Sequence, residues 1–427
     1  MQTVGPVRSD ERISSLDVIR GFALLGILLM NIVGFGLAYA YDDPTNAGGA
    51  TGLNLWTWVT MHILAEGKMR CLFSMVFGAG VVLLTSRPNA AADVYYRRNL
   101  WLMAAGVLHA FLLWQGEVLY PYALCALALY PFRVMEAKWL AWIGVGMMVI
   151  IAGFNLGSAL EMKKTIEEGK AALAVTGKLT EEQEEAKKKW EEVRKHAKPT
   201  PEEVEKTNKR WQGGIVDVVK VRAESVWRWH SMAYYHYYNL DLFSMMFLGM
   251  ALFKWGVFSG TRSLRFYGVM AGVGYLIGLS LNSFTAYTRV VNHFDIVVNI
   301  YTTLTYDVGR LSIALAHVAV LILFVKGRVM RWLTGSLGAI GQMALTNYLT
   351  HSVVCSTIFC GYGFGLFGKL QRYELYYVVA GLWTFQMIMS PIWLQHFHFG
   401  PAEWVWRSLT YWKKQPMRKE MAVEVAG

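Results

Sequence analysis

Long apolar runs separated by short polar segments dominate this chain of 427 residues. A helix needs about 20 predominantly apolar residues to cross the hydrocarbon core of a bilayer. We count ten candidate crossings, at residues 15–37, 57–85, 97–115, 117–133, 138–160, 240–257, 263–284, 302–325, 336–360 and 374–398. The pattern therefore predicts an all-α, polytopic helical membrane protein with about ten transmembrane helices. The first run is too long for a signal-peptide core, so we expect it to stay as a helix.

The first run carries three polar groups. Asp17 and Arg20 are three residues apart, so they share a helix face and can pair at the membrane edge. Asn31 lies deep in the run, where its amide needs a partner or a cavity. An anchoring ion pair with a helix-packing amide explains this pattern, and a catalytic role is the alternative.

Basic residues mark one side of the predicted bundle. Alternate short loops and the tail hold Arg8, Arg12, Arg87, Arg97, Arg98, Arg133, Lys138, Lys254, Arg262, Arg265, Lys326, Arg328, Arg331, Arg407, Lys413, Lys414, Arg418 and Lys419. The opposite loops hold almost none. Cytoplasmic loops are enriched in Lys and Arg, so both termini are expected in the cytoplasm. The net charge of +11 thus reflects topology rather than nucleic-acid binding.

One polar segment interrupts the apolar pattern. Residues 161–230 are rich in balanced Glu and Lys, with Thr180 and Thr200 placed as helix N-caps. Trp190, Val193 and Trp211 could dock the segment on the membrane surface. We interpret it as a solvated helical insert outside the cytoplasm, with a dedicated binding module as the alternative. The predicted domains are a five-helix bundle at 1–160, the insert at 161–230, a second five-helix bundle at 231–400 and a basic cytoplasmic tail at 401–427.

Ionisable side chains inside apolar runs are the main functional candidates, because burying them in a membrane is costly. The second run holds His62, Glu66, Lys68 and Arg70 within a short distance. Such a cluster predicts either a polar cavity or an internally neutralised set of ion pairs between helices.

The hairpin between the third and fourth runs supplies further candidates. His109 lies in the third run, Glu117 at the hairpin tip and Tyr122 just after it. Histidine titrates near neutral pH and serves as a general base, although a membrane histidine also serves simply as a hydrogen-bonding group between helices.

Several classes of site are not expected. The four cysteines lie singly in apolar runs, which predicts neither a disulfide framework nor a metal site. The sequence has no P-loop, dinucleotide fingerprint, HExxH or GxSxG motif. It also shows no inverted repeat and no pair of helices broken by Gly or Pro, which weakens a secondary-transporter interpretation.

Three stretches together resemble the YeiB-like family of bacterial membrane proteins. They are LDVIRGFALLGILLMNI, KMRCLFSMVFGAG with RRNLWLMAAGVLHAFLLWQGEVLYPYAL, and GQMALTNYLTHS with FGPAEWVWRSLTYWKKQPMR. The opening stretch also resembles transmembrane acyltransferases of the heparan-glucosaminide acetyltransferase type. That resemblance implies transfer of an acyl group from cytosolic acyl-CoA to an acceptor across the membrane. It places Asp17 and Arg20 in the family's R-G motif region and Asn31 at the reaction centre. No His follows the first run at 37–56, so His62 and His109 are the nearest candidates.

These observations lead to an acyltransferase hypothesis with acyl-CoA, such as acetyl-CoA, as the donor. The expected catalytic residues are His109, Asn31 and His62; the cofactor-binding residues are Arg20, Asp17, Arg407 and Glu403; the substrate-lining residues are Glu66, Lys68, Arg70, Glu117 and Tyr122. Expected partners are membrane lipids and an extracytoplasmic small-molecule or glycan acceptor, and a homo-oligomer is left open. A transporter or channel for a small polar solute is the alternative, and a non-catalytic scaffold is a third possibility.

Overall fold

The computed structural model describes residues 13–86, 91–229 and 232–419, without the side chains of residues 229–237. In this part of the chain the regular structure is helical, apart from one isolated bridge between Phe397 and Arg418. The prediction of an all-α fold is therefore confirmed. Some of the predictions fall outside the described residues. They are the basic residues Arg8, Arg12 and Arg87, the predicted boundary between the insert and the second bundle at residues 230 and 231, and the last eight residues of the tail.

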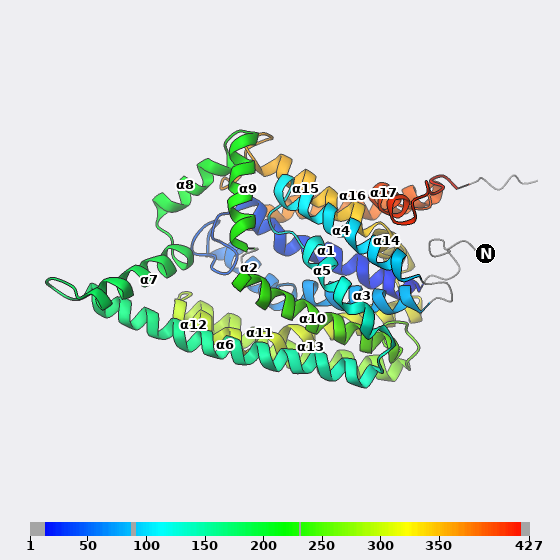
Figure 1. Ribbon diagram of the computed structural model, residues 1–427, viewed down its shortest axis with the longest axis horizontal. Coiled ribbons are helices and arrows are strands. Elements are labelled where there is room, and N and C mark those ends of the chain that lie inside the picture. Colours follow the sequence, from blue (N-terminus) through cyan, green and yellow to red (C-terminus); the bar gives the residue numbers. More distant parts are fainter. Residues whose placement is uncertain (1–12, 87–90, 230–231, 420–427) are drawn as a thin grey trace, which may run out of the picture.

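The helices follow the apolar runs closely (Figure 1). In the first half they are α1 (Ser14–Gly36), α2 (Gly52–Leu64), α3 (Lys68–Thr85), α4 (Ala92–Leu112), α5 (Leu119–Leu129), the 3-10 helix η2 (Tyr130–Val134), α6 (Ala137–Leu173), α7 (Glu181–Ala197), α8 (Pro201–Trp211) and α9 (Ile215–Trp229). In the second half they are α10 (Met232–Lys254), α11 (Leu264–Val291), α12 (Ile296–Thr302), η3 (Thr303–Thr305), α13 (Tyr306–Gly327), α14 (Arg331–Gln342), α15 (Ala344–Phe359), α16 (Leu375–His396) and α17 (Pro401–Tyr411).

Six helical stretches in the described residues are long and apolar enough to cross a membrane. They are Ser14–Gly36, Gly52–Thr85, Ala137–Leu173, Leu264–Val291, Ile296–Gly327 and Leu375–His396. The most apolar window of α1 is 72% buried, whereas those of α6 and α11 are 17% buried. The first helix thus forms the centre of the bundle, and α6 and α11 turn apolar side chains outward, as expected of helices that face lipid.

Two runs predicted as continuous helices are each broken in the structure. The first breaks between α2 and α3 at Gly67, whose φ of +70° no L side chain adopts readily. The second breaks at Met343, between α14 and α15. There the Glu403 carboxylate of α17 accepts hydrogen bonds from the free N–H groups of Leu345 and Thr346, at 2.6 and 3.1 Å. Because an outside group caps the new helix, the break needs no Gly or Pro.

Small residues set a close contact between two helices in the core. A Cβ on Gly21 would lie 2.0 Å from the Leu337 carbonyl oxygen, and one on Gly341 would lie 1.9 Å from the carbonyl oxygen of Asp17. The backbones of α1 and α14 therefore touch, which larger side chains would prevent. This contact fixes the start of α1 beside the end of α14.

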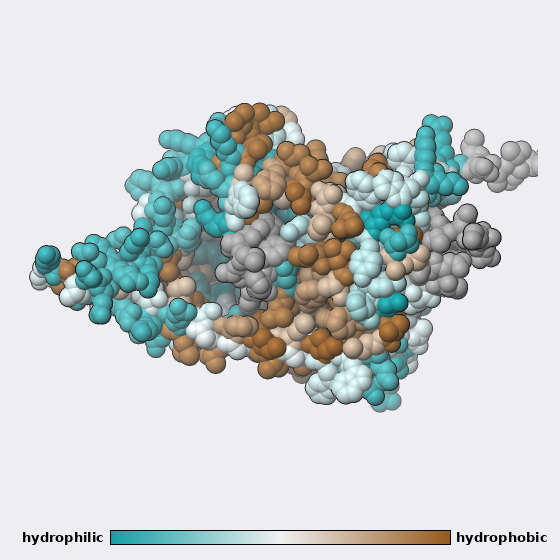
Figure 2. Space-filling model, viewed as in Figure 1, coloured by the Kyte–Doolittle hydropathy of each residue, from teal (hydrophilic) through white to brown (hydrophobic). Residues whose placement is uncertain are grey.

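The polar insert lies at the opposite end of the molecule from α17 (Figure 1). Both expected N-caps are confirmed, because Thr180 and Thr200 each form a complete capping box. Trp190 is buried against α6, where a Cβ on Gly169 would meet it at 2.1 Å, and the Trp211 ring stacks on Phe367. Hydrophilic residues cover this end and hydrophobic residues the body (Figure 2). Helix α6 runs unbroken through residue 160 and so joins the bundle to the insert.

Candidate functional site

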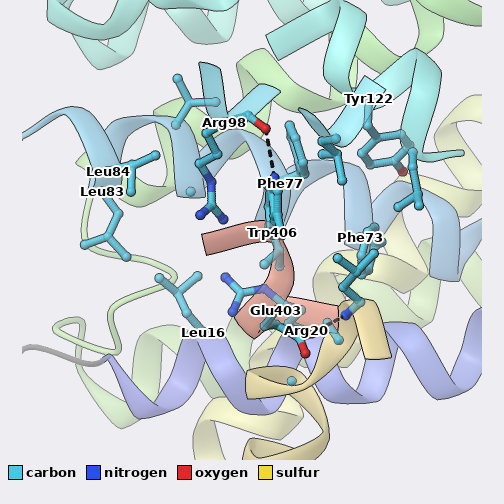
Figure 3. Close-up of a pocket in the computed structure, with 18 of the residues that line it drawn as sticks. Leu16, Arg20, Phe73, Phe77, Leu83, Leu84, Arg98, Tyr122, Glu403 and Trp406 are labelled. Carbon is cyan, nitrogen blue, oxygen red and sulfur yellow. Dashed lines mark hydrogen bonds between the residues drawn. The ribbon is translucent and has the colours of Figure 1, made fainter. Parts of the chain in front are cut away.

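Two pockets lie along opposite halves of α1. The first, here called the apolar pocket, has a volume of about 240 Å³ and begins beside the N-terminal half of α1 (Figure 3). Its walls are mostly apolar side chains of α1, α3 and α4, such as Leu16, Ile27, Phe73, Phe77 and Leu102. A pocket of this kind accommodates the hydrocarbon part of an amphiphilic ligand.

Three arginines lie at the basic end of the apolar pocket. They are Arg20, Arg98 and Arg407, from α1, α4 and α17. The Asp17 carboxylate pairs with Arg20 at 2.7 Å. The Arg98 guanidinium lies 3.7 Å from the centre of the Trp406 ring, next to which Figure 3 shows it. Guanidinium groups in this number suit a phosphate-bearing head group.

Glu403 lines the same pocket, yet its oxygens are already used by the protein. Besides the two backbone N–H groups it caps, it accepts a 2.6 Å hydrogen bond from the Thr346 hydroxyl. Burial raises the pKa of the Glu403 carboxyl, and the hydrogen bonds from Thr346 oppose that rise. Glu403 therefore shapes the pocket by holding α15 in place.

The second pocket, here called the polar pocket, has a volume of about 270 Å³ and adjoins the C-terminal end of α1. Its ionisable lining residues are Asp42, His62, Glu66, Arg70, Asp241, Arg289, Arg310 and Arg372. Charges of both signs in one cavity suit a polar ligand with several hydrogen-bonding groups. Of these residues, Asp42, Arg289 and Arg372 were not marked by the sequence pattern, whereas Asp241 and Arg310 are ionisable residues at the start of apolar runs.

The break between α2 and α3 shapes the polar pocket. It turns Glu66 toward α13, where the Tyr306 hydroxyl donates to Oε1 of Glu66 at 3.0 Å. His62 stacks on Trp58, and its Nε2 lies 3.0 Å from the hydroxyl of Thr285. Both side chains come from the broken turn, so the break is what brings them to the cavity.

Lys68 does not line either pocket. Its Nζ is fully buried and donates to the backbone carbonyl of His62 and to Oδ1 of Asn282, each at 2.6 Å. The first of these bonds satisfies a carbonyl left open at the end of α2. Lys68 thus closes the helix break and ties it to α11.

An ion-pair network forms the inner wall of the polar pocket. Arg310 of α13 contacts Asp241 of α10 through both terminal nitrogens and pairs with Asp307 at 2.7 Å. Arg70 of α3 pairs with the same Asp241 at 3.2 Å. Of the four residues in the second run, Arg70 is neutralised by Asp241, Lys68 is held by two neutral oxygens, and His62, Glu66 and Arg70 line a cavity.

One turn of α3 separates the two pockets. Arg70 lines the polar pocket and Phe73 the apolar pocket. Tyr122 of α5 closes the apolar pocket here, with its hydroxyl 2.5 Å from Oγ of Ser74 and 3.5 Å from the Arg70 carbonyl oxygen. The linings of the two pockets therefore meet within one turn of α3.

A buried Ser–His–Glu group lies behind the wall of the apolar pocket. His109 Nε2 is 2.8 Å from Oγ of Ser352, and His109 Nδ1 contacts Glu117. All three side chains are nearly inaccessible. The sequence pointed to His109 and Glu117, and Ser352 ends the family-like stretch GQMALTNYLTHS. The pairing of Ser352 with His109 was not predicted, because the two residues are 243 positions apart.

The remaining candidate, Asn31, lies in neither pocket's lining. It is half-buried and shares a face of α1 with Ile27, which does line the apolar pocket. His109 is also behind that pocket's wall rather than in it. Asn31 and His109 are therefore not brought into one open chamber in this conformation. No group of three metal-ligating side chains is found among the described residues.

Comparison with known proteins identifies relatives along nearly the whole chain. The family model described as "Protein of unknown function (DUF418)" matches residues 252–413. The chain is 30% identical over 406 residues to "Uncharacterized protein YeiB" of Escherichia coli (strain K12), covering 94% of this chain and 96% of that protein. It is 27% identical over 449 residues to "Uncharacterized protein YxaH" of Bacillus subtilis (strain 168), covering 99% and 100%.

Proposed function

Since the chain belongs to the YeiB-like family that the DUF418 model describes, we propose from its two pockets that it is an integral membrane acyltransferase. In this proposal it moves an acyl group from cytosolic acyl-CoA to an extracytoplasmic acceptor. The observation that carries the proposal is the approach of an apolar, arginine-rimmed pocket and a polar pocket to within one turn of α3. A transfer enzyme needs two such sites with reacting groups close together.

The proposed topology has ten crossings in a bacterial inner membrane, with both termini in the cytoplasm. The six apolar stretches are joined in this count by α4, α5 with η2, α10 and the broken pair α14–α15. Arg98 supports this orientation, because its guanidinium lies over the Trp406 ring of α17 next to the basic tail. Lys254 and Arg133 lie together, since Lys254 Nζ donates to the Arg133 carbonyl at 2.7 Å.

The donor would occupy the apolar pocket. Its acyl chain would lie against Phe73 and Phe77, and the phosphates of its CoA would meet Arg98 and Arg407. Arginine binds phosphate through paired N–H groups, which makes it the preferred residue at such a rim. Anionic lipid head groups offer the same chemistry and compete for the rim.

The acceptor would occupy the polar pocket. A sugar or other polyhydroxylated molecule could hydrogen-bond to the mixed charges there, and the His62 ring is the base nearest to it. A histidine in such a pocket can hydrogen-bond the acceptor and orient it. His109 is in neither pocket's lining and lies behind the wall of the apolar pocket.

The test uses the full chain in lipid nanodiscs. Incubation with acyl-CoA and candidate acceptors should release CoA thiol, which a thiol-reactive dye measures. The double variant Arg98→Gln, Arg407→Gln should raise the KM for acyl-CoA at least tenfold, because it removes two phosphate contacts. Arg262→Gln, an exposed arginine outside the pocket, is the matched control and should leave KM unchanged.

Absence of both CoA release and acyl-CoA binding in the wild-type protein would contradict the proposal. Binding without release, across a broad set of hydroxyl and amine acceptors, would reduce it to a binding function. An unchanged KM for acyl-CoA in the double variant would show that the donor does not bind at the arginine rim.

Transport of a small polar solute is the second candidate, favoured by the two broken helices. Secondary transporters form their sites at such breaks, and the break at Gly67 is at the polar pocket. Uptake of a polar solute into proteoliposomes in the absence of acyl-CoA would support this function. Uptake that requires acyl-CoA would support transfer instead.

A further inference from the structure

Ser352, His109 and Glu117 meet from three separate elements. Ser352 is on α15, His109 is in the last turn of α4, and Glu117 is in the hairpin before α5. The exposed fractions of the three residues are 1%, 2% and 5%, in that order. Their contacts have the order nucleophile, base and orienting acid, since His109 Nε2 faces Ser352 and its Nδ1 faces Glu117.

The behaviour of Ser352 within its helix is informative. A Ser or Thr inside a helix often donates to the backbone carbonyl four residues earlier. In α15, Thr350 and Thr357 do so, at 2.9 and 2.8 Å. Ser352 instead directs its hydroxyl across the bundle to His109. Its oxygen is thus held by the one group that can remove its proton.

The Glu117 carboxylate is equally well fixed. Its Oε1 accepts hydrogen bonds from the N–H groups of Leu119 and Tyr120 at the start of α5, and its Oε2 contacts His109. These bonds set the orientation of the imidazole, with hydrogen on Nδ1 and a lone pair on Nε2 facing Ser352. A carboxylate in this role also stabilises the imidazolium that forms when histidine accepts a proton.

The group is one side-chain layer from the apolar pocket. Val118, Leu119 and Tyr348 line that pocket, and the Tyr348 ring centre lies 5.1 Å from that of His109. Within the described residues the buried Tyr348 hydroxyl makes no hydrogen bond of good geometry, and a weak contact with the Val118 backbone restrains the ring. Rotation of Tyr348 would open a path from the pocket to Ser352.

We propose that Ser352 is the residue that first accepts the acyl group, so that transfer proceeds through an acyl-serine ester. This inference rests on the proposed acyltransferase function and adds a covalent step to it. The Ser352 oxygen attacks the thioester carbonyl while its proton passes to His109 Nε2. The carbon–sulfur bond then breaks, and the CoA thiolate leaves with that proton as free CoA thiol.

The second half of the reaction reverses these roles. The acceptor's hydroxyl or amine gives its proton to His109 and attacks the ester carbonyl. The bond to the Ser352 oxygen breaks, and His109 returns the proton to that oxygen. Atoms and charge balance, and acyl-CoA and the acceptor are the only reactants consumed.

The first experiment needs no acceptor. The full chain in nanodiscs is mixed with acyl-CoA, and the expected result is release of about one CoA thiol per chain, together with an acyl mass increase on the peptide that contains Ser352. Ser352→Ala should lose both signals. Ser356→Ala is the matched control, because Ser356 is equally buried on the same helix but hydrogen-bonds to Leu113 and Arg222 instead.

A second experiment is independent of acyl-CoA. An alkyl fluorophosphonate, which phosphonylates activated serines with loss of fluoride, should label Ser352 in the wild-type protein, and His109→Gln should lose at least nine-tenths of this labelling. Tyr348→Ala should label faster than wild type, since it opens the path. Thermal unfolding of each variant shows whether it is folded.

The outcomes separate this inference from the acyltransferase proposal. Acceptor-dependent turnover that persists in folded Ser352→Ala would overturn the acyl-serine step and leave the acyltransferase standing. Failure of the fluorophosphonate to label Ser352 in both wild type and Tyr348→Ala would also overturn the step. A third outcome is His109-dependent labelling of Ser352 in a protein that releases no CoA from acyl-CoA. This result would contradict acyl-CoA as the donor and would keep Ser352 as an activated nucleophile.

Discussion

Lys68 Nζ lies 2.6 Å from Oδ1 of Asn282, a contact that joins the broken second helix to α11. The same ammonium group closes the end of α2 through the His62 carbonyl. Asn282 in turn donates to the Gly278 carbonyl of its own helix at 2.7 Å. The wall of the polar pocket therefore depends on one fully buried cation.

Replacing Lys68 with Met should destabilise the fold. The change leaves the His62 carbonyl and the Asn282 amide oxygen without a donor, at about 1–3 kcal/mol for each group. Thermal unfolding can be followed with a thiol-reactive dye, because Cys71, Cys125, Cys355 and Cys360 are buried. Lys163→Met, on the exposed part of α6, should leave the midpoint unchanged. Equal midpoints for the two variants would contradict the role given to Lys68.

Gly67→Ala should disturb the polar pocket itself. An alanine there is strained at φ +70°, by about 1–2 kcal/mol, and its Cβ would lie 2.0 Å from the Tyr306 hydroxyl. The hydrogen bond from Tyr306 to Glu66 must therefore break or move. Gly80→Ala, where a Cβ meets no atom within 4 Å, is the control. A lower unfolding midpoint and weaker acceptor binding are expected for Gly67→Ala alone.

Gly80→Leu should shorten the range of acyl chains accepted. Gly80 lines the apolar pocket with open space beside it, so the leucine fills cavity volume without a clash. The kcat/KM for long-chain acyl-CoA should fall at least tenfold relative to acetyl-CoA. Gly153→Leu on α6, equally uncrowded but outside the pocket, should keep the wild-type ratio. An unchanged ratio in Gly80→Leu would show that the chain binds elsewhere.

Glu403→Gln should become relatively more stable as pH rises. Burial raises the folded-state pKa of Glu403, so the folded protein holds this proton more tightly than the unfolded chain does. The stabilisation from the protonated form is complete below the unfolded pKa, near 4.3, and is lost as pH rises through the folded value. The difference in unfolding midpoint, Gln variant minus wild type, should grow across that interval. A constant difference from pH 4 to 8 would contradict it.

Arg310→Lys should strongly destabilise the folded protein, although lysine keeps the positive charge. The guanidinium contacts Asp241 through two nitrogens and Asp307 through one of them. A lysine ammonium cannot span both carboxylates, and disrupting a buried pair costs about 3–5 kcal/mol. Loss of the cooperative unfolding transition or a large drop in its midpoint is expected. A midpoint close to wild type would mean that the carboxylates find other partners.

Much of the fold follows from apolar run length. The start of α1 and the insert caps at Thr180 and Thr200 were predicted from local patterns, because their physics acts within a few residues. The breaks at Gly67 and Met343 were missed. A hydropathy window averages over one glycine, and the cap at Met343 comes from Glu403, which is some 60 residues away.

The site was predictable only where charge was conspicuous. His62, Glu66 and Arg70 stood out as ionisable groups in an apolar run, and they do line the polar pocket. Ser352 and Arg372 gave no such signal, since serine is common in membrane helices and Arg372 is in a loop. Their roles depend on partners brought near by tertiary packing.

The one-turn separation between Arg70 and Phe73 also has an electrical consequence. A bilayer normally spreads its voltage over about 30 Å of hydrocarbon, whereas the rise between these residues is about 4.5 Å. If both pockets are filled with water and open to opposite faces of the membrane, the voltage falls mainly across this turn of α3. Any charge moved through the full drop gains or loses about 2.3 kcal/mol per 100 mV. The membrane voltage would then change the free energy of moving any charged group past Tyr122, from one pocket to the other.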